Sequence, residues 1–230
     1  MLFTVLIINS YNDVHFTNVG KEQELQPLGE EFGTTVYGYY PKCDIKFIAK
    51  SWIEGAKFKS PIPKDIDPDS LRFESRFESG NLMKAVRVTE KYYELYLRPD
   101  LYTTRHCQWF YFRVENMRND VEYTFSIVNF TKPDSQYSVG MKPVLYSVKE
   151  TERSGVGWTR AGDQVRYYRD HSTPRDAPRR FIMSFSVRFP HSKDTVYLAH
   201  CYPYRSAREV INYTGCGVKR EVSCKIKYLK

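Results

Sequence analysis

The sequence lacks the features that mark membrane, secreted and disulfide-rich proteins. No apolar run approaches the roughly 18 residues that a membrane helix needs. The largely apolar start, residues 2–8, has no basic flank and no small-residue cleavage site, so we expect a strand or a stray start there, not a signal peptide. The five cysteines are odd in number and form no CxxC pair; they are Cys43, Cys107, Cys201, Cys216 and Cys224. This usage predicts free, often buried thiols in a reducing compartment.

Acidic residues are outnumbered by basic ones. The 230 residues include 35 Lys and Arg against 27 Asp and Glu, which gives a net charge of +8 and a pI near 9.1. A basic surface indicates an acidic partner, which nucleic acid, anionic lipid or an acidic polypeptide could supply. A hydrophobic content of 41% excludes a disordered chain, and 16% aromatic residues favour β-sheet.

Helical periodicity is also missing, whereas period-two alternation is frequent. It is clear in residues 92–98, 121–130 and 181–189, where apolar and polar residues alternate, while residues 107–114 are apolar on both faces and indicate a central strand. We predict an all-β fold, an antiparallel β-sandwich of about eight or nine strands, the number that the usual strand length allows between residues 71 and 204.

The composition divides the chain into three parts. Residues 60–69 are rich in Pro and Asp and predict a linker. We therefore predict an irregular N-terminal extension and linker over 1–70, with strands at 33–40 and 42–53, and the sandwich domain over 71–204. Residues 205–230 form a basic tail that ends without a capping or polar signal.

Two carboxylates recur in the stretch LRFESRFESGNL, residues 71–82. Paired carboxylates can divide acid and base roles when their environments differ. On a strand, however, alternation places Phe73 and Phe77 on one face and Glu74 and Glu78 on the other. We favour this structural interpretation, because Ser79-Gly80-Asn81 would end any helix and the flanking segments are strand-like.

Metal-ligand spacings are absent as well. The histidines are His15, His106, His171, His191 and His200, and none has a Glu three or four residues after it. His191 and Asp194 lie in a predicted hairpin turn. His106-Cys107 and His200-Cys201 place neighbouring side chains on opposite strand faces, so neither pair can chelate one ion without a kink. We predict no zinc site in this chain.

The remaining candidates have ordinary structural explanations. There is no GxSxG elbow, and Gly155, Gly157 and Gly162 fit no phosphate-binding loop, so we expect turns there, with Trp158 in the core. Asn129 and Asn212 begin glycosylation-type triplets that arise easily by chance.

The stretch 166–180 interleaves arginines with two tyrosines. Aromatic rings between arginines can stack on bases, which leaves single-stranded nucleic-acid binding through Tyr167 and Tyr168 as an alternative. We favour a solvated loop after a strand, because the loop contains Pro and two Asp.

Several stretches together resemble the N-terminal domain of the cytosolic carboxypeptidases, the M14-type zinc peptidases that trim glutamates from polyglutamylated tubulin. They include LRFESRFESGNLMKA, HCQWFYFRVENM, YTFSIVNFTKPDS, GWTRAGDQVRYY and AHCYPY, in order from about residue 71 to residue 204. The stretches SIVNFTKP and GDQVRYYR resemble the branch with cytosolic carboxypeptidases 2 and 3. PLGEEFGTTVY, residues 27–37, resembles the segment before the domain in that branch.

The resemblance implies a β-sandwich that packs beside a zinc-containing catalytic domain and holds none of its ligands. The HxxE zinc pair, the third His, the substrate-binding Arg and the general-base Glu of the family have no counterparts in this sequence. We therefore expect no catalytic, cofactor-binding or metal-ligating residue here, no cofactor, and no peptidase activity from this chain alone.

Expected partners are the chain's own catalytic domain, if a longer product exists, and acidic tubulin tails, in the cytoplasm at microtubules or cilia. Nucleic acid is the less favoured partner, and we expect no membrane partner. The alternative is a stand-alone interaction module or short isoform without peptidase activity.

Overall fold

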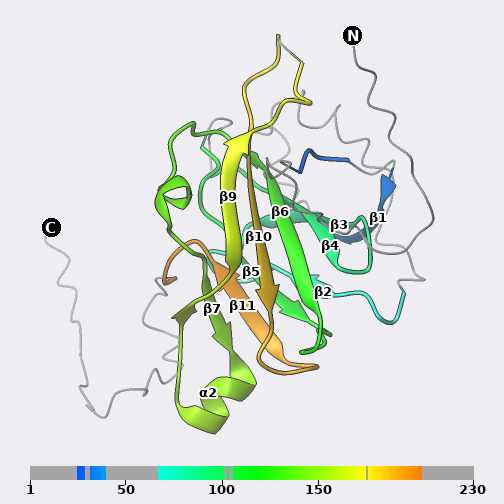
Figure 1. Ribbon diagram of the computed structural model, residues 1–230, viewed down its shortest axis with the longest axis vertical. Helices are drawn as coiled ribbons and strands as arrows, with labels where there is room; N and C mark the ends of the chain where they lie inside the picture. Colours follow the sequence, from blue (N-terminus) through cyan, green and yellow to red (C-terminus); the bar gives the residue numbers. More distant parts are fainter. Residues whose placement is uncertain are drawn as a thin grey trace, which may run out of the picture.

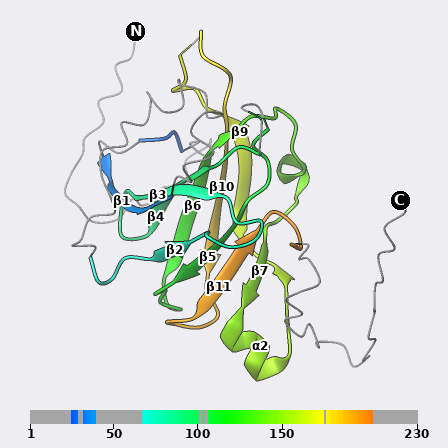
Figure 2. The ribbon, with the colours of Figure 1, turned by 180° about the vertical axis from the view of Figure 1, so that it is seen from behind.

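The computed structural model describes residues 25–28, 32–39, 67–100, 103, 106–174 and 176–203, which form two β-sheets packed face to face (Figures 1 and 2). In spatial order, the six-stranded sheet contains β1 (Thr34–Gly38), β3 (Leu82–Arg87), β4 (Tyr92–Leu97), β6 (Glu122–Phe130), β10 (Phe181–Arg188) and β9 (Asp163–Arg169). The five-stranded sheet contains β2 (Arg72–Glu74), β5 (Tyr111–Glu115), β11 (Thr195–Ala199), β7 (Val144–Ser147) and β8 (Thr159–Arg160). The predicted β-sandwich is confirmed.

The topology differs from the expectation in three details. Ten strands, β2 to β11, lie between residues 71 and 204, because short strands such as β8 carry too few residues for a visible pattern. β4 and β6 pair in parallel, since the chain crosses to the other sheet for β5 between them. β1 confirms the strand expected at 33–40, but it pairs with β3 in the six-stranded sheet although it precedes residue 71. The strand expected at 42–53 lies outside the described residues.

One side chain completes the parallel pairing. Asn129 is 1% exposed, and its Oδ1 accepts from the Leu97 backbone N–H at 2.9 Å while its Nδ2 donates to the Leu97 carbonyl at 2.8 Å. The amide therefore satisfies both backbone groups of a strand residue, as a neighbouring strand would.

The core lies between the sheets and is mainly aromatic. Phe125 of β6 is fully buried, and its ring lies 5.6 to 6.4 Å from four others, those of Phe73, Tyr93, Phe185 and Phe189. These separations are typical of favourable aromatic pairs. The inward residues are the apolar set that the period-two pattern predicted for 121–130 and 181–189. β5 lies between β2 and β11, which confirms it as an interior strand.

A short helix, α2 (Val148–Ser154), was not expected. It buries none of its residues, so it has no apolar stripe, and no helix in the described part of the chain is long and apolar enough to cross a bilayer. The available signal was the capping pattern Ser147-x-x-Glu150. Ser147 Oγ accepts from the Glu150 backbone N–H at 3.0 Å and donates to Asp194 Oδ2 at 2.5 Å.

We predict that Ser147→Ala lowers the free energy of unfolding by about 2–3 kcal/mol, because it removes the helix cap and the hydroxyl donor of a buried carboxylate. Asp194 is 2% exposed, so water replaces that donor poorly. Urea unfolding checks the value. Ser154→Ala is the matched control, since its hydroxyl lies at the exposed end of α2, where it donates to the Glu150 carbonyl and accepts from the Val156 backbone N–H. Equal effects of the two changes would contradict the assignment.

Candidate interaction surface

The outer face of the five-stranded sheet carries a cluster of aromatic side chains. Alternation turns Phe112 of β5 and Leu198 of β11 into the core, so Tyr111 and Tyr197, together with Tyr146 of β7, point outward. Three more rings join them from segments beside the strands. We call the six residues the aromatic face: Phe77, Trp109, Tyr111, Tyr146, Trp158 and Tyr197.

The rings of the aromatic face form one connected layer. Tyr111 lies at its centre, with ring centroids 4.9 Å from Phe77, 6.0 Å from Tyr197 and 6.0 Å from Trp158. Tyr111 is 1% exposed, whereas the other five are half-buried. Trp109 is held by its indole Nε1, which donates to the Ser79 carbonyl at 2.7 Å. A rigid, half-covered layer of Tyr and Trp has the composition of a protein interface.

A histidine and a cation extend this layer at one edge. The His200 ring lies 6.4 Å from Trp109, and its Nδ1 is 3.0 Å from the Tyr137 hydroxyl. Burial, together with the nearby Arg160, lowers the pKa of His200, so the ring is neutral at physiological pH. Tyr202 is 58% exposed, with the Arg160 guanidinium 6.0 Å from its ring. This edge therefore offers cation–π chemistry to a partner.

The structure does not bring Glu74 and Glu78 together as an acid/base pair. Glu74 ends β2 and pairs with Arg76, whose Nη2 is 2.5 Å and whose Nε is 2.9 Å from the carboxylate. These hydrogen bonds hold the pKa of Glu74 at about 2, so it cannot take up a proton near neutrality. Glu78 lies exposed in the following turn.

The prediction that Phe73 and Phe77 share a face is wrong. Phe73 is in the core, whereas Phe77 belongs to the aromatic face on the other side of the sheet. The reason is a tight turn that begins at Ser75, whose Oγ donates to the Leu82 carbonyl at 2.7 Å. A side chain at Gly80 would place its Cβ 2.3 Å from the Ser75 carbonyl oxygen, so the turn requires glycine.

The histidines lie apart from one another. His191 Nε2 is 2.7 Å from Glu150 Oε2, which fastens the β10–β11 turn to α2, and Asp194 binds Ser147 instead. His106 is exposed while Cys107 is buried, as expected of opposite faces, and burial raises the pKa of the Cys107 thiol. His15 is outside the described residues. In the part of the chain that the structure describes, no three His, Cys, Asp or Glu side chains are grouped to hold a metal ion.

Two further expectations concern aromatic residues. Trp158 does not fill the core as predicted; it belongs to the aromatic face, because Gly155 and Gly162 turn the chain around the edge of the five-stranded sheet. Tyr167 stacks on Phe181 at 5.8 Å, and Tyr168 is 8% exposed with its hydroxyl on the Leu25 carbonyl. Neither tyrosine presents a free ring for stacking on bases.

The sandwich and its aromatic face coincide with a known domain. The profile that matches the chain describes the cytosolic carboxypeptidase N-terminal domain and covers residues 73–200, which includes most of both sheets and the whole aromatic face. The chain belongs to this family of N-terminal domains. Its relatives include cytosolic carboxypeptidase 3 from Bos taurus, 45% identical over 74% of this chain and 17% of the relative.

Two forms of cytosolic carboxypeptidase 2 are similarly related. The protein from Danio rerio is 41% identical over 94% of this chain and 31% of its own length, and that from Homo sapiens is 43% identical over 80% and 21%. The chain thus spans less than a third of the length of these cytosolic carboxypeptidases. What they share with it is the N-terminal part.

In this N-terminal domain, we predict that the Glu74–Arg76 pair stabilises the fold above the usual carboxyl pKa and that its contribution disappears as the pH falls from about 4.5 toward about 2. Glu74→Gln should lower the free energy of unfolding by about 1 kcal/mol at pH 7, a value reduced by the exposure of Arg76. Urea unfolding at pH 7 and pH 3 measures the difference. Glu78→Gln is the control, and an identical pH profile for all three proteins would contradict the prediction.

Proposed function

We propose that this chain acts as the non-catalytic N-terminal domain of a cytosolic zinc metallocarboxypeptidase that removes glutamates from polyglutamylated tubulin. The observation that carries the proposal is the family match over 73–200, which coincides with the folded sandwich. The relatives named cytosolic carboxypeptidases are three or more times longer than the matched part, so the chemistry belongs to the remainder of such enzymes.

Zinc hydrolysis needs three protein ligands, an open position for water and a general base. The described residues do not fit this requirement, since they contain no group of three His, Cys, Asp or Glu side chains, and His191 and His200 pair with Glu150 and Tyr137 instead. The role left to the domain is to bind, either the catalytic part of the same polypeptide or the protein substrate.

The aromatic face suits the first of these partners. Five half-buried rings on one rigid sheet offer apolar area at little cost in side-chain entropy, which is characteristic of permanent interfaces. The exposed Tyr202 beside Arg160 extends that surface at its rim. A catalytic domain packed on this face would cover the remaining apolar area of the rings.

Capture of the endogenous protein with an antibody to residues 71–204 tests the proposal. A species much larger than 27.2 kDa, with peptides beyond Lys230 and glutamate-releasing activity, is the expected result. A species of 27.2 kDa without such peptides would overturn it in favour of a stand-alone interaction module.

The net charge of +8 supports docking to acidic tubulin tails. We predict that the chain binds a polyglutamate peptide at about 20 mM salt and loses most of that binding above about 300 mM, because exposed charges are screened over a few ångströms there. Fluorescence anisotropy of a labelled peptide measures the affinity, and a polylysine peptide is the control. Absence of binding at low salt would remove the docking role and leave the domain assignment intact.

A further inference from the structure

The outer face of the six-stranded sheet combines a small apolar cluster, Val128, Tyr168 and Ile182, with polar side chains that are also buried. Ser126 of β6 is fully buried, and Ser184 and Ser186 of β10 are 5% and 6% exposed. Alternation had predicted the polar face of these strands as the one away from the core, which normally faces water. The two serines at 126 and 184 are direct cross-strand partners in the middle of the sheet, and their small side chains leave room for another chain above them.

Part of the cover is an extended segment of this chain, Leu25–Leu28. At one end, the Tyr168 hydroxyl donates to the Leu25 carbonyl at 2.5 Å, and the His171 backbone N–H donates to Gln26 Oε1 at 3.0 Å. At the other end, the Leu28 backbone N–H donates to Glu94 Oε1 at 2.6 Å. The segment therefore runs from Tyr168 of β9 to Glu94 of β4, across β10 and β6.

Glu94 is an unusual residue for this position. It lies in β4, is fully buried, and is flanked by Tyr92 and Tyr96, whose hydroxyls are 3.5 and 3.3 Å from its carboxylate oxygens. Burying a carboxylate costs free energy, and hydrogen bonds donated to its charged oxygens offset that cost. The N–H of Leu28 is thus bound by a strong acceptor, whereas its side chain is 47% exposed and contributes little.

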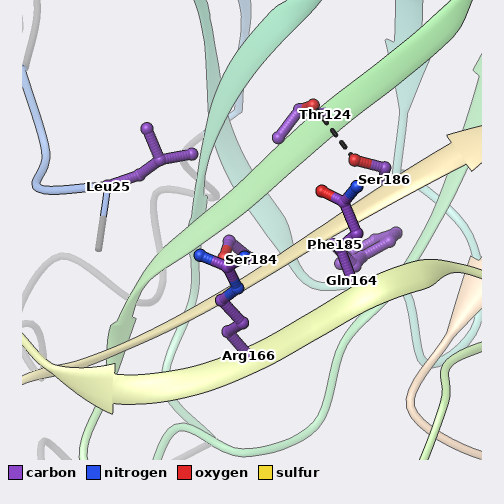
Figure 3. Close-up of a pocket in the computed structure, with 7 residues that line it drawn as sticks. All are labelled: Leu25, Thr124, Gln164, Arg166, Ser184, Phe185 and Ser186. Carbon is purple, nitrogen blue, oxygen red and sulfur yellow. Dashed lines mark hydrogen bonds between the residues drawn. The ribbon is translucent and has the colours of Figure 1, made fainter. Parts of the chain in front are cut away.

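A hollow remains beside the Leu25 end (Figure 3). Its volume is about 20 Å³, and it is lined by Leu25, Thr124, Gln164, Arg166, Ser184, Phe185 and Ser186. Gln164 has a φ of 51°, in the left-handed region, beside an irregularity in the β9–β10 pairing. The surface beside Leu25 is therefore lined mainly by polar side chains of β6, β9 and β10.

We propose that the outer face of the six-stranded sheet is a peptide-binding groove, that Leu25–Leu28 occupies it as an internal ligand, and that an extended proline-containing peptide of another protein binds there when this segment is released. Its recognition elements are the Glu94 carboxylate, which accepts the N–H after the proline, and the Tyr168 hydroxyl, which donates to a carbonyl three residues earlier.

The chemistry of the segment supports this assignment. Pro27 fixes its own φ and restricts Gln26 to extended backbone, so such a peptide loses little entropy on binding. Recognition through main-chain groups, with shallow pockets for side chains, is a common mode of peptide binding. An internal ligand competes with an external one at an effective concentration in the millimolar range, so the groove should bind peptide weakly until the segment is loosened.

The test uses the full chain, two variants at Leu28 and one double variant. Leu28→Pro removes the N–H that Glu94 accepts, whereas Leu28→Ala keeps it and is the matched control. The probe is a fluorescein-labelled peptide with the sequence of residues 21–33. We expect Leu28→Pro to bind the probe about tenfold more tightly than the wild type and Leu28→Ala, and Glu94→Gln in the Leu28→Pro background to reverse the gain.

Equal binding by Leu28→Pro and Leu28→Ala, or a gain that survives Glu94→Gln, would overturn the proposal. Wild-type protein gives a second measurement that needs no variant: excess unlabelled peptide should accelerate amide hydrogen exchange within Leu25–Leu28, and unchanged exchange would also overturn it. A wild-type dimer that the probe dissociates would overturn the proposal, because the groove would then hold the segment of a second copy. None of these outcomes depends on the proposed carboxypeptidase role.

Discussion

The contact of Phe125 with the rings around it is the interaction on which the sandwich depends. Phe73 reaches this ring from the five-stranded sheet, whereas Tyr93 and Phe185 flank it within its own sheet. A single ring thus joins the two layers and the parallel β4–β6 pair. Because interiors are close-packed, a change in its volume would be felt in both sheets at once. The inward faces therefore leave little freedom for substitution.

The two outer faces are covered by different chemistry. The five-stranded sheet presents the aromatic face, whose rings cover one another and leave five half-buried. The six-stranded sheet presents small hydroxyl residues and the buried Glu94, with a segment of the chain across them. Rings suit a permanent apolar partner, whereas main-chain hydrogen bonds over a smooth floor suit an exchangeable strand. The two partners that we propose would therefore bind opposite sides of the sandwich and would not compete.

Much of the fold could be predicted from the sequence, but only part of each outer face could. Alternation identified the core side of 121–130 and 181–189, because that pattern is local and physical. It could not show that Phe77 reverses its face, since a turn built on Ser75 and Gly80 is a tertiary arrangement. It also could not show that Ser184 is covered, because burial of a polar face depends on a segment some 150 residues away in the chain. The helix after Ser147 could have been predicted from its capping pattern.

The side chain of Asn129 sets a limit on where this domain can fold. Its amide nitrogen is the atom to which a sugar would be attached in the glycosylation triplet Asn-Phe-Thr. The same nitrogen donates a hydrogen bond to the Leu97 carbonyl within the fold. A sugar attached there would replace a hydrogen on the nitrogen that donates to the Leu97 carbonyl. It would also have to fit at a side chain that is only 1% exposed. Glycan and sandwich therefore exclude each other. A copy of this chain that met an oligosaccharide transferase before folding would lose its native state.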